Sequence, residues 1–445
     1  MLSILAVKIG EITETFFLEQ IVRFLRFEDP SLVTSLFGCV LLGAVLSLLG
    51  SFMVLRKMSL MGDTLGHAVL PGICVAFMLT GQKALLSTFA GAMISGLLGV
   101  LLIGWIVRYS RIKPDAALGM ILSSFFGLGI VFLTMIQKTG TGNASGLDKF
   151  LFGQAAALSR SDVTALAVVT LICLFLVLVF YKELKLASFD PHFAAVLGLP
   201  VGLLQTLLMI LTTVAVVASI QAVGVVLVSA MLIIPPATAL LFVKRVSSML
   251  ILAIFLGMIS GFFGAFLSFL GPSLPTGPFM VVCAAFFFGL AFLFAPAHGI
   301  AVVFFKRRAR RSRTIRENIL KSIYHFFEGK NFAEERVTLE DLAAFRSETV
   351  LEIKKSVKSL VGKKWVQKEG DWIAFTQGGK DLAVQLVRRH RLWELFLVKE
   401  AMLPADHVHA DAEELEHILP ESVMRELEDS LKHAKFDPHG KPIPS

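Results

Sequence analysis

The sequence predicts an all-α polytopic membrane protein of about 8–9 transmembrane helices, followed by a soluble winged-helix α+β domain. Two observations lead to this fold class. The 445 residues are 55% hydrophobic and have a mean hydropathy of +0.75, which is too apolar for a soluble protein. Apolar residues dominate as far as about Phe305, and charged residues take over after it. The chain therefore divides into a membrane region and a soluble region.

Nine stretches are close to the length of about 20 residues that a helix needs to cross a bilayer. They lie near 31–55, 64–81, 84–108, 115–136, 163–181, 202–220, 223–242, 248–270 and 277–297. Very short connections, such as 221–222, leave the number between eight and nine. Residues 1–30 alternate Phe, Ile and Leu with Glu and Arg at helical spacing, so we expect them to lie on the membrane surface.

Basic residues orient the predicted spans. The clusters at 56–57, 108–113, 182–185, 244–245 and from Lys306 onward all fall on one side, which is therefore expected to be cytoplasmic. The soluble region is then cytoplasmic as well, and nine spans would place the N-terminus outside. No cleavable signal peptide is expected. The four cysteines lie inside apolar runs without a CxxC pair, so we expect buried thiols and no disulfide framework.

Asp63 and His67 are the most informative residues of the membrane region. They are four residues apart at the start of an apolar run, so on a helix they share one face. Ionisable residues in a membrane span are costly and usually functional. A carboxylate with an imidazole suits Mn, Fe(II) or Zn. The alternative is structural, with Asp63 capping the helix and His67 bonding to a backbone carbonyl.

The surrounding stretch, Leu-Arg-Lys-Met-Ser-Leu-Met-Gly-Asp-x-x-x-His-Ala-Val-Leu-Pro-Gly, resembles the manganese/zinc/iron ABC-transporter permeases. This resemblance implies that Asp63 and His67 coordinate the transported metal. It also implies a bacterial inner-membrane protein that works with a second permease copy or a paralogue. The other implied partners are a separate ATPase subunit and an extracytoplasmic metal-binding protein. The chain has no P-loop motif, so it is not expected to be an enzyme by itself. A secondary metal transporter is the alternative.

The connection 182–201 begins a short helix at Asp190-Pro191 and ends it at Gly198. From the pattern alone it is either a structural connector or a docking element. It resembles the coupling segment by which these permeases contact their ATPase. The residues that this resemblance assigns to coupling are Phe189, Asp190, Pro191, Phe193, Ala195 and Gly198.

A basic run occupies residues 306–316, directly after the last predicted span. It suits a cytoplasmic stop signal that touches anionic lipid. A protease-accessible hinge and a contribution to nucleic-acid binding are the alternatives. We treat it as a linker between a membrane permease domain, 1–305, and two soluble regions, a winged helix-turn-helix at 317–378 and a metal-binding and dimerisation region at 379–445.

The first soluble region shows three helices and a hairpin, which is the order of a winged helix. Ile319, Ile323 and Phe326–Phe327 mark the first helix, and Thr338 is expected to cap the second. Ser347 is expected to cap a third helix with an apolar stripe at Val350, Ile353, Val357, Leu360 and Val361. A hairpin turns at Gly370. Lys354, Lys355 and Lys358 lie off the stripe and suit contact with DNA, or alternatively a solvated face of a protein-interaction module.

Two groups of possible metal ligands follow the hairpin. His390 and Glu394 are four residues apart, and His409, Glu413, Glu416 and His417 share one helical face. These N and O donors fit Mn or Fe(II) and could hold Zn. The alternative is an acidic, exposed helix with local Glu–His pairs.

The region 317–445 resembles the diphtheria-toxin-repressor/manganese-repressor family. The resemblance is carried by Arg-Arg-His-Arg-Leu-x-Glu-Leu-Phe-Leu, Val-His-x-x-Ala-Glu-Glu-Leu-Glu-His and Asp-Pro-His-Gly-Lys-Pro-Ile-Pro. It implies a metal-activated, dimeric DNA-binding repressor. Glu413, Glu416 and His417 match the primary metal site, and His390, Glu394 and His409 match its neighbour. Asn318 and Lys321 stand where the family has first-helix ligands, and Glu317 is a candidate substitute. A tail that only senses cytoplasmic metal and regulates the transporter is the alternative.

Overall fold

The computed structural model describes residues 21–24, 26–27, 29–81, 85–138, 158–271, 274–297, 299–400, 402–404, 421–431 and 434–444. The chain forms two compact units, Met1–Val302 and Val303–Ser445. We refer to them as the membrane unit and the soluble unit and describe each by itself.

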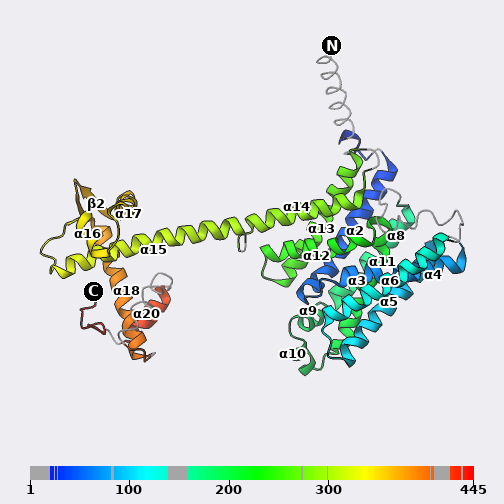
Figure 1. The fold of residues 1–445 in the computed structure, drawn as a ribbon, viewed down its shortest axis with the longest axis horizontal. Helices are drawn as coiled ribbons and strands as arrows, with labels where there is room; N and C mark the ends of the chain where they lie inside the picture. Colours follow the sequence, from blue (N-terminus) through cyan, green and yellow to red (C-terminus); the bar gives the residue numbers. More distant parts are fainter. Residues whose placement is uncertain are drawn as a thin grey trace, which may run out of the picture. The chain divides into compact units, whose positions relative to one another are not determined.

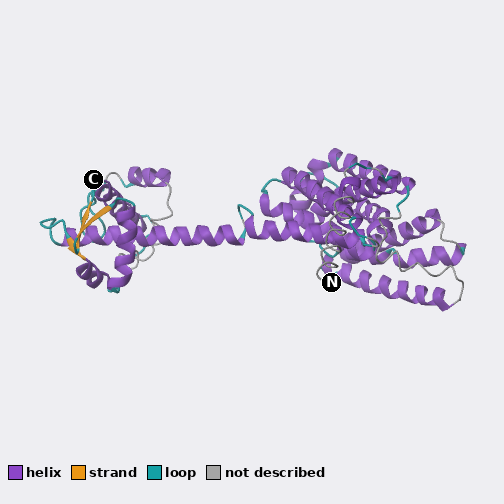
Figure 2. Ribbon diagram, turned by 90° about the horizontal axis from the view of Figure 1, so that it is seen from above, coloured by secondary structure: helices purple, strands orange, loops and turns teal. Residues whose placement is uncertain are grey.

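The membrane unit is a bundle of α-helices (Figures 1 and 2). Its helices are α2 (Pro30–Leu55), α3 (Met61–Ala68), α4 (Leu70–Thr80), α5 (Leu85–Tyr109), α6 (Pro114–Lys138), α8 (Arg160–Val179), α9 (Tyr181–Phe189), α10 (Pro191–Val196), α11 (Val201–Val223), α12 (Val225–Phe242), α13 (Val246–Phe269) and α14 (Thr276–Phe294). Within the described residues, 8 spans are long and apolar enough to cross a membrane, with α3 and α4 forming one of them. The apolar part of α12, Leu227–Phe242, is shorter. The prediction of eight to nine transmembrane helices is confirmed.

The N-terminal segment packs against the helix bundle where the structure describes it. Phe24 is only 1% exposed, and its ring packs edge-on against Phe262 and Phe266 of α13, with centroids 5.7 and 4.9 Å apart. Residues 21–24 therefore pack against the bundle at this point, because the phenylalanine rings of α13 cover Phe24. Residues 1–20 of the expected surface helix lie outside the described part of the chain.

Helix α2 is packed closely by its neighbours through glycines. A Cβ atom on Gly43 would overlap the backbone carbonyl of Gly257 on α13, and one on Gly50 would overlap the carbonyl of Leu232 on α12. Lipid gives helices no hydrophobic reason to associate, so close backbone approach is a main source of their attraction. The glycines thus decide which faces of α2, α12 and α13 meet. The four cysteines are buried and free, as expected.

The soluble unit contains α15 (Ile300–Gly329), β1 (Val337–Thr338), α16 (Leu339–Arg346), α17 (Val350–Gly362), β2 (Val366–Glu369), β3 (Trp372–Phe375), α18 (Gln377–Lys399) and α20 (Glu421–Ser430). The strands form one antiparallel sheet in the order β1-β3-β2 (Figure 2). Gly370 turns the β2–β3 hairpin with a φ of 61°, which favours glycine. Three helices followed by a hairpin confirm the predicted winged-helix order, and the basic run 306–316 is helical throughout.

The caps and the stripe of the winged helix agree only in part with the sequence expectation. Thr338 caps α16 as expected, accepting a hydrogen bond from the backbone N–H of Asp341 at 3.0 Å. The expectation for Ser347 is wrong: it ends α16 at a φ of 55°, and Thr349 caps α17. Val350 and Val361 are 43% and 38% exposed, because only the middle of the α17 stripe meets the core.

We predict that Gly43→Ala destabilises the membrane unit, because the added methyl group pushes α13 away from α2. Overpacking of this kind costs about 1–3 kcal/mol. Gly104→Ala on α5 is the matched control, since a Cβ atom there meets nothing within 4 Å. Thermal unfolding of the purified proteins in detergent measures the difference. Equal unfolding temperatures for the two variants would contradict the glycine packing described here.

Candidate functional site

Asp63 and His67 lie on α3, the first half of a broken membrane span. Pro71 sits at the start of α4 and has no N–H to donate to the carbonyl of His67, four residues earlier. The regular helix is therefore interrupted at Val69, between α3 and α4. The interruption comes six residues after Asp63 and two residues after His67, so the sequence of the span itself places this pair just before the break.

Four helices hold α3 in place. Gly62 and Gly66 allow close approach of α12, since a Cβ atom on either would crowd Ser229 or Val225. The hydroxyl of Thr64 donates to the carbonyl of Leu118 on α6 at 3.3 Å. The hydroxyl of Ser95 on α5 donates to the carbonyl of Ala68 at 2.6 Å. Helix α11 also contacts α3. These contacts fix the position of the helix that carries the ionisable pair.

The imidazole of His67 has a free nitrogen in the described structure. Its ring lies edge-on to Phe126 of α6, with centroids 4.7 Å apart. Nδ1 is buried, and no described residue gives it a hydrogen bond. Asp63, one turn away and also half-buried, is close enough to act on His67 electrostatically. Leu60 takes the cap position of α3 without a side-chain bond, so Asp63 does not cap this helix. A cation is a fitting partner for this nitrogen and carboxylate.

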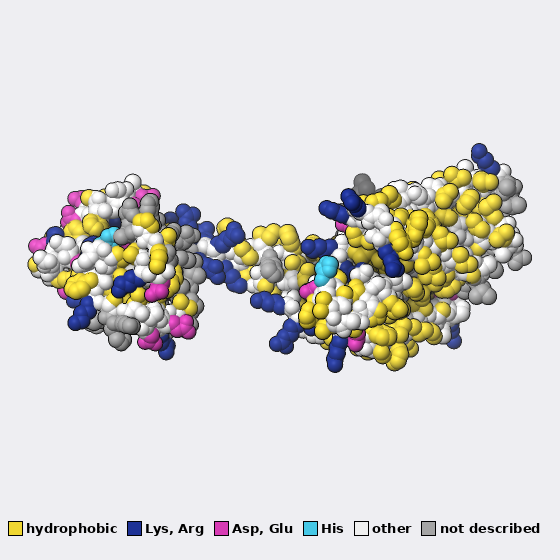
Figure 3. All heavy atoms as spheres, turned by 90° about the horizontal axis from the view of Figure 1, so that it is seen from below, with side chains coloured by type: hydrophobic (Ala, Val, Ile, Leu, Met, Phe, Trp, Pro, Cys, Tyr) yellow, Lys and Arg dark blue, Asp and Glu magenta, His cyan; other side chains and the backbone are white. Residues whose placement is uncertain are grey.

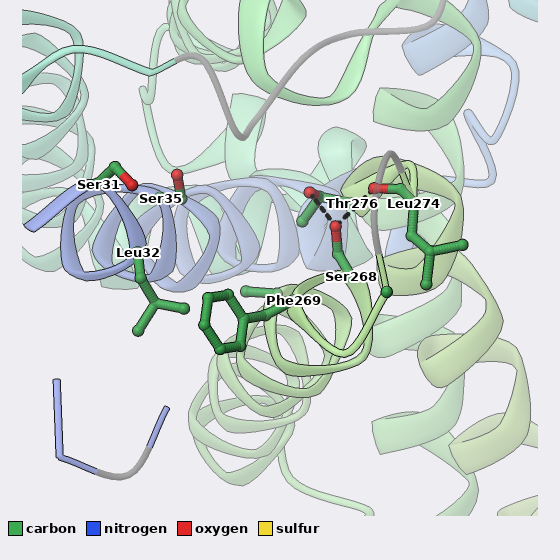
Figure 4. A pocket seen from close by; sticks show the side chains of 9 residues that line it. Ser31, Leu32, Ser35, Ser268, Phe269, Leu274 and Thr276 are labelled. Carbon is green, nitrogen blue, oxygen red and sulfur yellow. Dashed lines mark hydrogen bonds between the residues drawn. The ribbon is translucent and has the colours of Figure 1, made fainter. Parts of the chain in front are cut away.

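A small cavity with hydroxyl groups in its wall lies at the start of α2, at the opposite end of this helix from Arg56. It measures about 240 Å³ and is lined by hydroxyls from α2, α13 and α14 (Figure 4). Ser268 donates to the carbonyl of Leu274 at 2.7 Å and bonds to the hydroxyl of Thr276 at 2.8 Å. Ser31 and Ser35 of α2 are the other hydroxyls. None of the described residues that line the cavity is charged, and Leu32, Phe269 and Leu274 contribute apolar wall, so the described lining does not make a strong ion site.

The predicted coupling residues are brought together around α10. Asp190 caps this helix by accepting a hydrogen bond from the N–H of Phe193 at 2.9 Å, and Pro191 begins it. Phe189 and Phe193 are 60% and 51% exposed, while Ala194 is fully buried against the bundle. Ala195 is exposed, and Gly198 ends the segment with a φ of 80°. The result is a short, capped helix that carries the exposed Phe193, next to the exposed Phe189 at the end of α9.

The predicted DNA-contacting lysines lie on one helix. Lys354, Lys355 and Lys358 of α17 are all exposed, whereas Ile353 and Val357 between them are buried in the winged-helix core. A helix that anchors one face in a core and presents lysines on the other can enter a DNA groove. The β2–β3 hairpin follows α17 directly in the position of a wing.

Two of the six predicted regulatory ligands are described, and they meet. His390 and Glu394 on α18 are each 2% exposed, and Nε2 of His390 lies 3.1 Å from a carboxylate oxygen of Glu394. The other four, His409, Glu413, Glu416 and His417, lie outside the described residues. In the described part of the chain no group of three His, Cys, Asp or Glu converges. The described part of α18 therefore places one nitrogen and one oxygen donor side by side.

The first helix of the soluble unit, α15, differs from the first helix of the repressor family that this region resembles, which carries metal ligands. Glu317, the candidate substitute ligand, is 3% exposed and pairs with Nε of Arg313 at 2.6 Å. Lys321, at a position where the related repressors carry an acid, is 6% exposed. A buried lysine in place of a carboxylate adds positive charge where a metal ligand would add negative charge, which weakens cation binding.

Sequence reasoning missed a buried charge network around Arg391. This side chain is 2% exposed and donates to Glu328 of α15 at 2.6 Å and to the carbonyl of Pro442 at 2.6 Å. Its Nε lies 3.5 Å from Asp437. Asp437 in turn accepts hydrogen bonds from the backbone N–H groups of His439 and Lys441. The signal in the sequence was an arginine beside His390 on the apolar face of α18, together with the Asp-Pro-His-Gly turn.

His325 joins this network at Glu328. Its Nδ1 lies 3.2 Å from a carboxylate oxygen of Glu328. Burial lowers the pKa of His325 from 6.5 to about 4, and the positive charges of Arg391 and Lys321 act in the same direction against the opposing effect of Glu328. The imidazole is therefore neutral in the folded unit at neutral pH.

We predict that His325 makes the soluble unit less stable in acid. Below pH 6.5 the unfolded chain protonates this histidine, whereas the folded unit resists protonation down to about pH 4. Stability is therefore complete above pH 6.5 and is lost as the pH falls toward 4. Thermal unfolding of the full-length protein between pH 7.5 and 4.5 should show a shallower slope for His325→Gln. His439→Gln, at an exposed histidine, is the control, and an unchanged slope in His325→Gln would contradict this role.

Comparison with known proteins gives two family matches. Residues 28–295 match the ABC 3 transport family, and residues 376–445 match a family described as "Iron dependent repressor, metal binding and dimerisation domain". The two matches fall on the membrane unit and on the C-terminal part of the soluble unit. They meet the expectations from the two sequence resemblances.

Individual relatives agree with these matches. The manganese transport system membrane protein MntC of Bacillus subtilis is 39% identical over 397 residues, covering 88% of this chain and 90% of the relative. The zinc transport system membrane protein TroC of Treponema pallidum is 38% identical over 282 residues, covering 63% of this chain and 95% of the relative. The solved structure of PsaBC from Streptococcus pneumoniae in complex with Fab is 35% identical, with a TM-score of 0.55, and covers 62% of this chain and 97% of that chain.

Proposed function

Because the chain belongs to the ABC 3 transport family, we propose that it is the membrane-spanning subunit of an ATP-driven importer of a divalent transition metal. The observation that carries this proposal is the half-buried Asp63–His67 pair, with its unpartnered imidazole nitrogen among the described residues. The metal is Mn, Fe or Zn, since one oxygen and one nitrogen donor suit these ions. Relatives named for manganese and for zinc support the same range.

The pair suits a relay more than a storage site. The transported ion is the substrate, and the Asp63 carboxylate and neutral His67 imidazole replace part of its hydration shell. Two ligands from one chain bind a cation weakly, and an ion that must leave again requires weak binding. The bend at Pro71 and the packing of α3 hold both ligands at fixed positions while the ion passes.

The proposed partners occupy the two ends of the bundle. A separate ATPase would contact the exposed ring of Phe189 at the end of α9 and that of Phe193 on α10, whose start is fixed by Asp190. An extracytoplasmic metal-binding protein would dock at the opposite end of the bundle, near Ser31 at the start of α2. A second permease copy or a paralogue would complete the pathway. The basic clusters support an inner-membrane orientation with the soluble unit in the cytoplasm.

We predict that Asp63→Ala and His67→Ala each lower metal uptake at least about tenfold, because loss of even an outer partner of a metal ligand costs that much. The measurement is ATP-dependent uptake of radioactive manganese by proteoliposomes that contain the reconstituted complex. Asp115→Ala, at an exposed carboxylate in the first turn of α6, should retain wild-type uptake. Normal uptake in the double variant would sink the relay. Uptake that needs no ATP would favour a secondary transporter.

The soluble unit carries a metal-repressor-like domain, and we infer that it senses the same class of metal. His390 and Glu394 would hold a regulatory Mn, Fe or Zn together with His409, Glu413, Glu416 and His417. Such an ion supplies positive charge that brings acidic side chains together. The exposed lysines of α17 would then bind DNA, which makes the tail a metal-responsive repressor. If it does not bind DNA, the tail is a cytoplasmic sensor that acts on the transporter.

We predict metal-dependent binding of the full-length protein in nanodiscs to DNA from its own promoter. Each contact from Lys354, Lys355 or Lys358 should add about 0.9 to the steepness of the log–log salt dependence, so Lys→Gln at each position removes that amount. Lys435→Gln, at an exposed lysine outside the winged helix, should leave the slope unchanged. Binding that is equal with and without manganese would contradict sensing. No binding with any metal would favour the sensor that acts on the transporter.

A further inference from the structure

One cavity of the membrane unit lies at the Arg56 end of the bundle and has no assigned occupant. It measures about 740 Å³ and lies between the connection after α2, the end of α5 and the start of α11. Its polar side chains come from Arg56, Arg108, Gln205 and Thr206, and its aromatic side chains are Trp105 and Tyr109. None of its described lining residues is Asp or Glu, so the cavity carries unbalanced positive charge.

Arg56 makes this charge unusual. Its Nη1 atom is buried, and no described residue gives it a hydrogen bond. Burial of an arginine without a partner is costly, because the guanidinium stays charged. Arg108 lies over the ring of Tyr109, with its Cζ 5.6 Å from the ring centroid, and is exposed at the end of α5. Two guanidinium groups around one cavity, one of them unsatisfied, fit an anionic group with several oxygen acceptors.

Helix α5 leads from this cavity along its outer face. Ile94, Leu98, Leu101 and Trp105 are 66, 48, 64 and 63% exposed and follow one another at helical spacing. Leu101 and Trp105 line the cavity, while Ile94 and Leu98 line a second, apolar groove of about 450 Å³ between α4 and α5. The four residues extend over about 16 Å of helix. This is about half of the hydrocarbon thickness of a bilayer, which is one leaflet.

The close approach of α4 and α5 forms the floor of this groove. Gly72 and Gly91 face each other so tightly that a Cβ atom on either would overlap the backbone of the other. The walls are the side chains of Pro71, Val75, Leu79 and Ile94. A charged cavity with aromatic residues, joined on one helix to an apolar groove, matches the two parts of a phospholipid.

We propose that this surface binds one anionic phospholipid, with its phosphate between Arg56 and Arg108 and an acyl chain along the α5 stripe. Gln205 and Thr206 face the headgroup and can bond to its hydroxyls. Trp105 lies at the boundary between headgroup and chain, where amphipathic aromatic rings prefer to sit. Basic pockets between transmembrane helices are suited to anionic headgroups on the cytoplasmic side. The proposal requires the whole lipid, since a free phosphate would leave the apolar groove unfilled.

The test is retention of lipid by the full-length protein. Protein from nanodiscs of equal phosphatidylglycerol and phosphatidylcholine is delipidated stepwise in detergent, and bound lipid is counted by native mass spectrometry. The wild-type protein should retain one phosphatidylglycerol in preference to phosphatidylcholine. Arg56→Gln/Arg108→Gln should weaken retention by about thirtyfold, since each cation near an anionic headgroup contributes about fivefold. Arg108→Gln alone, at an exposed residue, gives a readout if the double variant does not fold.

The matched control is Lys244→Gln/Arg245→Gln. It removes the same charge from an exposed connection between α12 and α13 and should leave retention unchanged. Leu101→Ala should also weaken retention of phosphatidylglycerol, because it shortens the apolar stripe. Equal retention of the two lipids would overturn the proposal, as would an equal loss in the control variant. Displacement of the lipid by soluble glycerol phosphate at millimolar concentration would overturn it as well, because the site would then recognise the phosphate alone.

Discussion

The membrane unit depends on one constraint: a carboxylate and an imidazole must be held inside a span, where no described residue gives Nδ1 of His67 a hydrogen bond. An unpaired polar group in such a place costs free energy, so the surrounding helices must fix it. Gly62 and Gly66 bring α12 against α3, and the hydroxyls of Thr64 and Ser95 bind α3 to α6 and α5. The same close packing through glycine holds α2 between α12 and α13 (Figure 1). Close packing through glycines therefore both holds the bundle together and fixes Asp63 and His67 in place.

The soluble unit meets a similar constraint with charge. Arg391 is buried between Glu328 of α15 and Asp437 of the C-terminal turn, and it directly follows His390 on α18. Removing one member would leave a buried charge without a partner, which costs more than the pair itself contributes. The network connects α15, which carries the basic run, with α18, which carries two proposed metal ligands, and with the last turn of the chain.

Figure 3 shows one face of the protein, on which Lys and Arg side chains lie on a largely hydrophobic membrane unit.

The sequence predicts what depends on local pattern. Apolar runs predicted the spans, Asp190-Pro191 predicted the start of a short helix, and alternation around Gly370 predicted the hairpin. The break between α3 and α4 at Pro71 was not predicted, because 64–81 was taken as one continuous span. It could not predict contacts between distant segments, such as Phe24 against the phenylalanines of α13 or Arg391 against Glu328. Ser347 was misplaced because both Ser347 and Thr349 are good caps, and only the left-handed turn that ends α16 decides between them. Asp63 and His67 were predictable as a pair, whereas the free Nδ1 depends on the packing of α6.

Direct binding of the transported metal by Asp63 and His67 can be measured by spectroscopy. Pulsed electron paramagnetic resonance of bound Mn²⁺ detects a coordinated imidazole nitrogen by its coupling to the electron spin. The full-length protein would carry His390→Gln, His409→Gln and His417→Gln so that the proposed regulatory site of the soluble unit contributes no histidine ligand. We expect a nitrogen coupling in this background and its loss when His67→Gln is added. A coupling that survives the loss of His67, or none in the background at saturating Mn²⁺, would contradict the account.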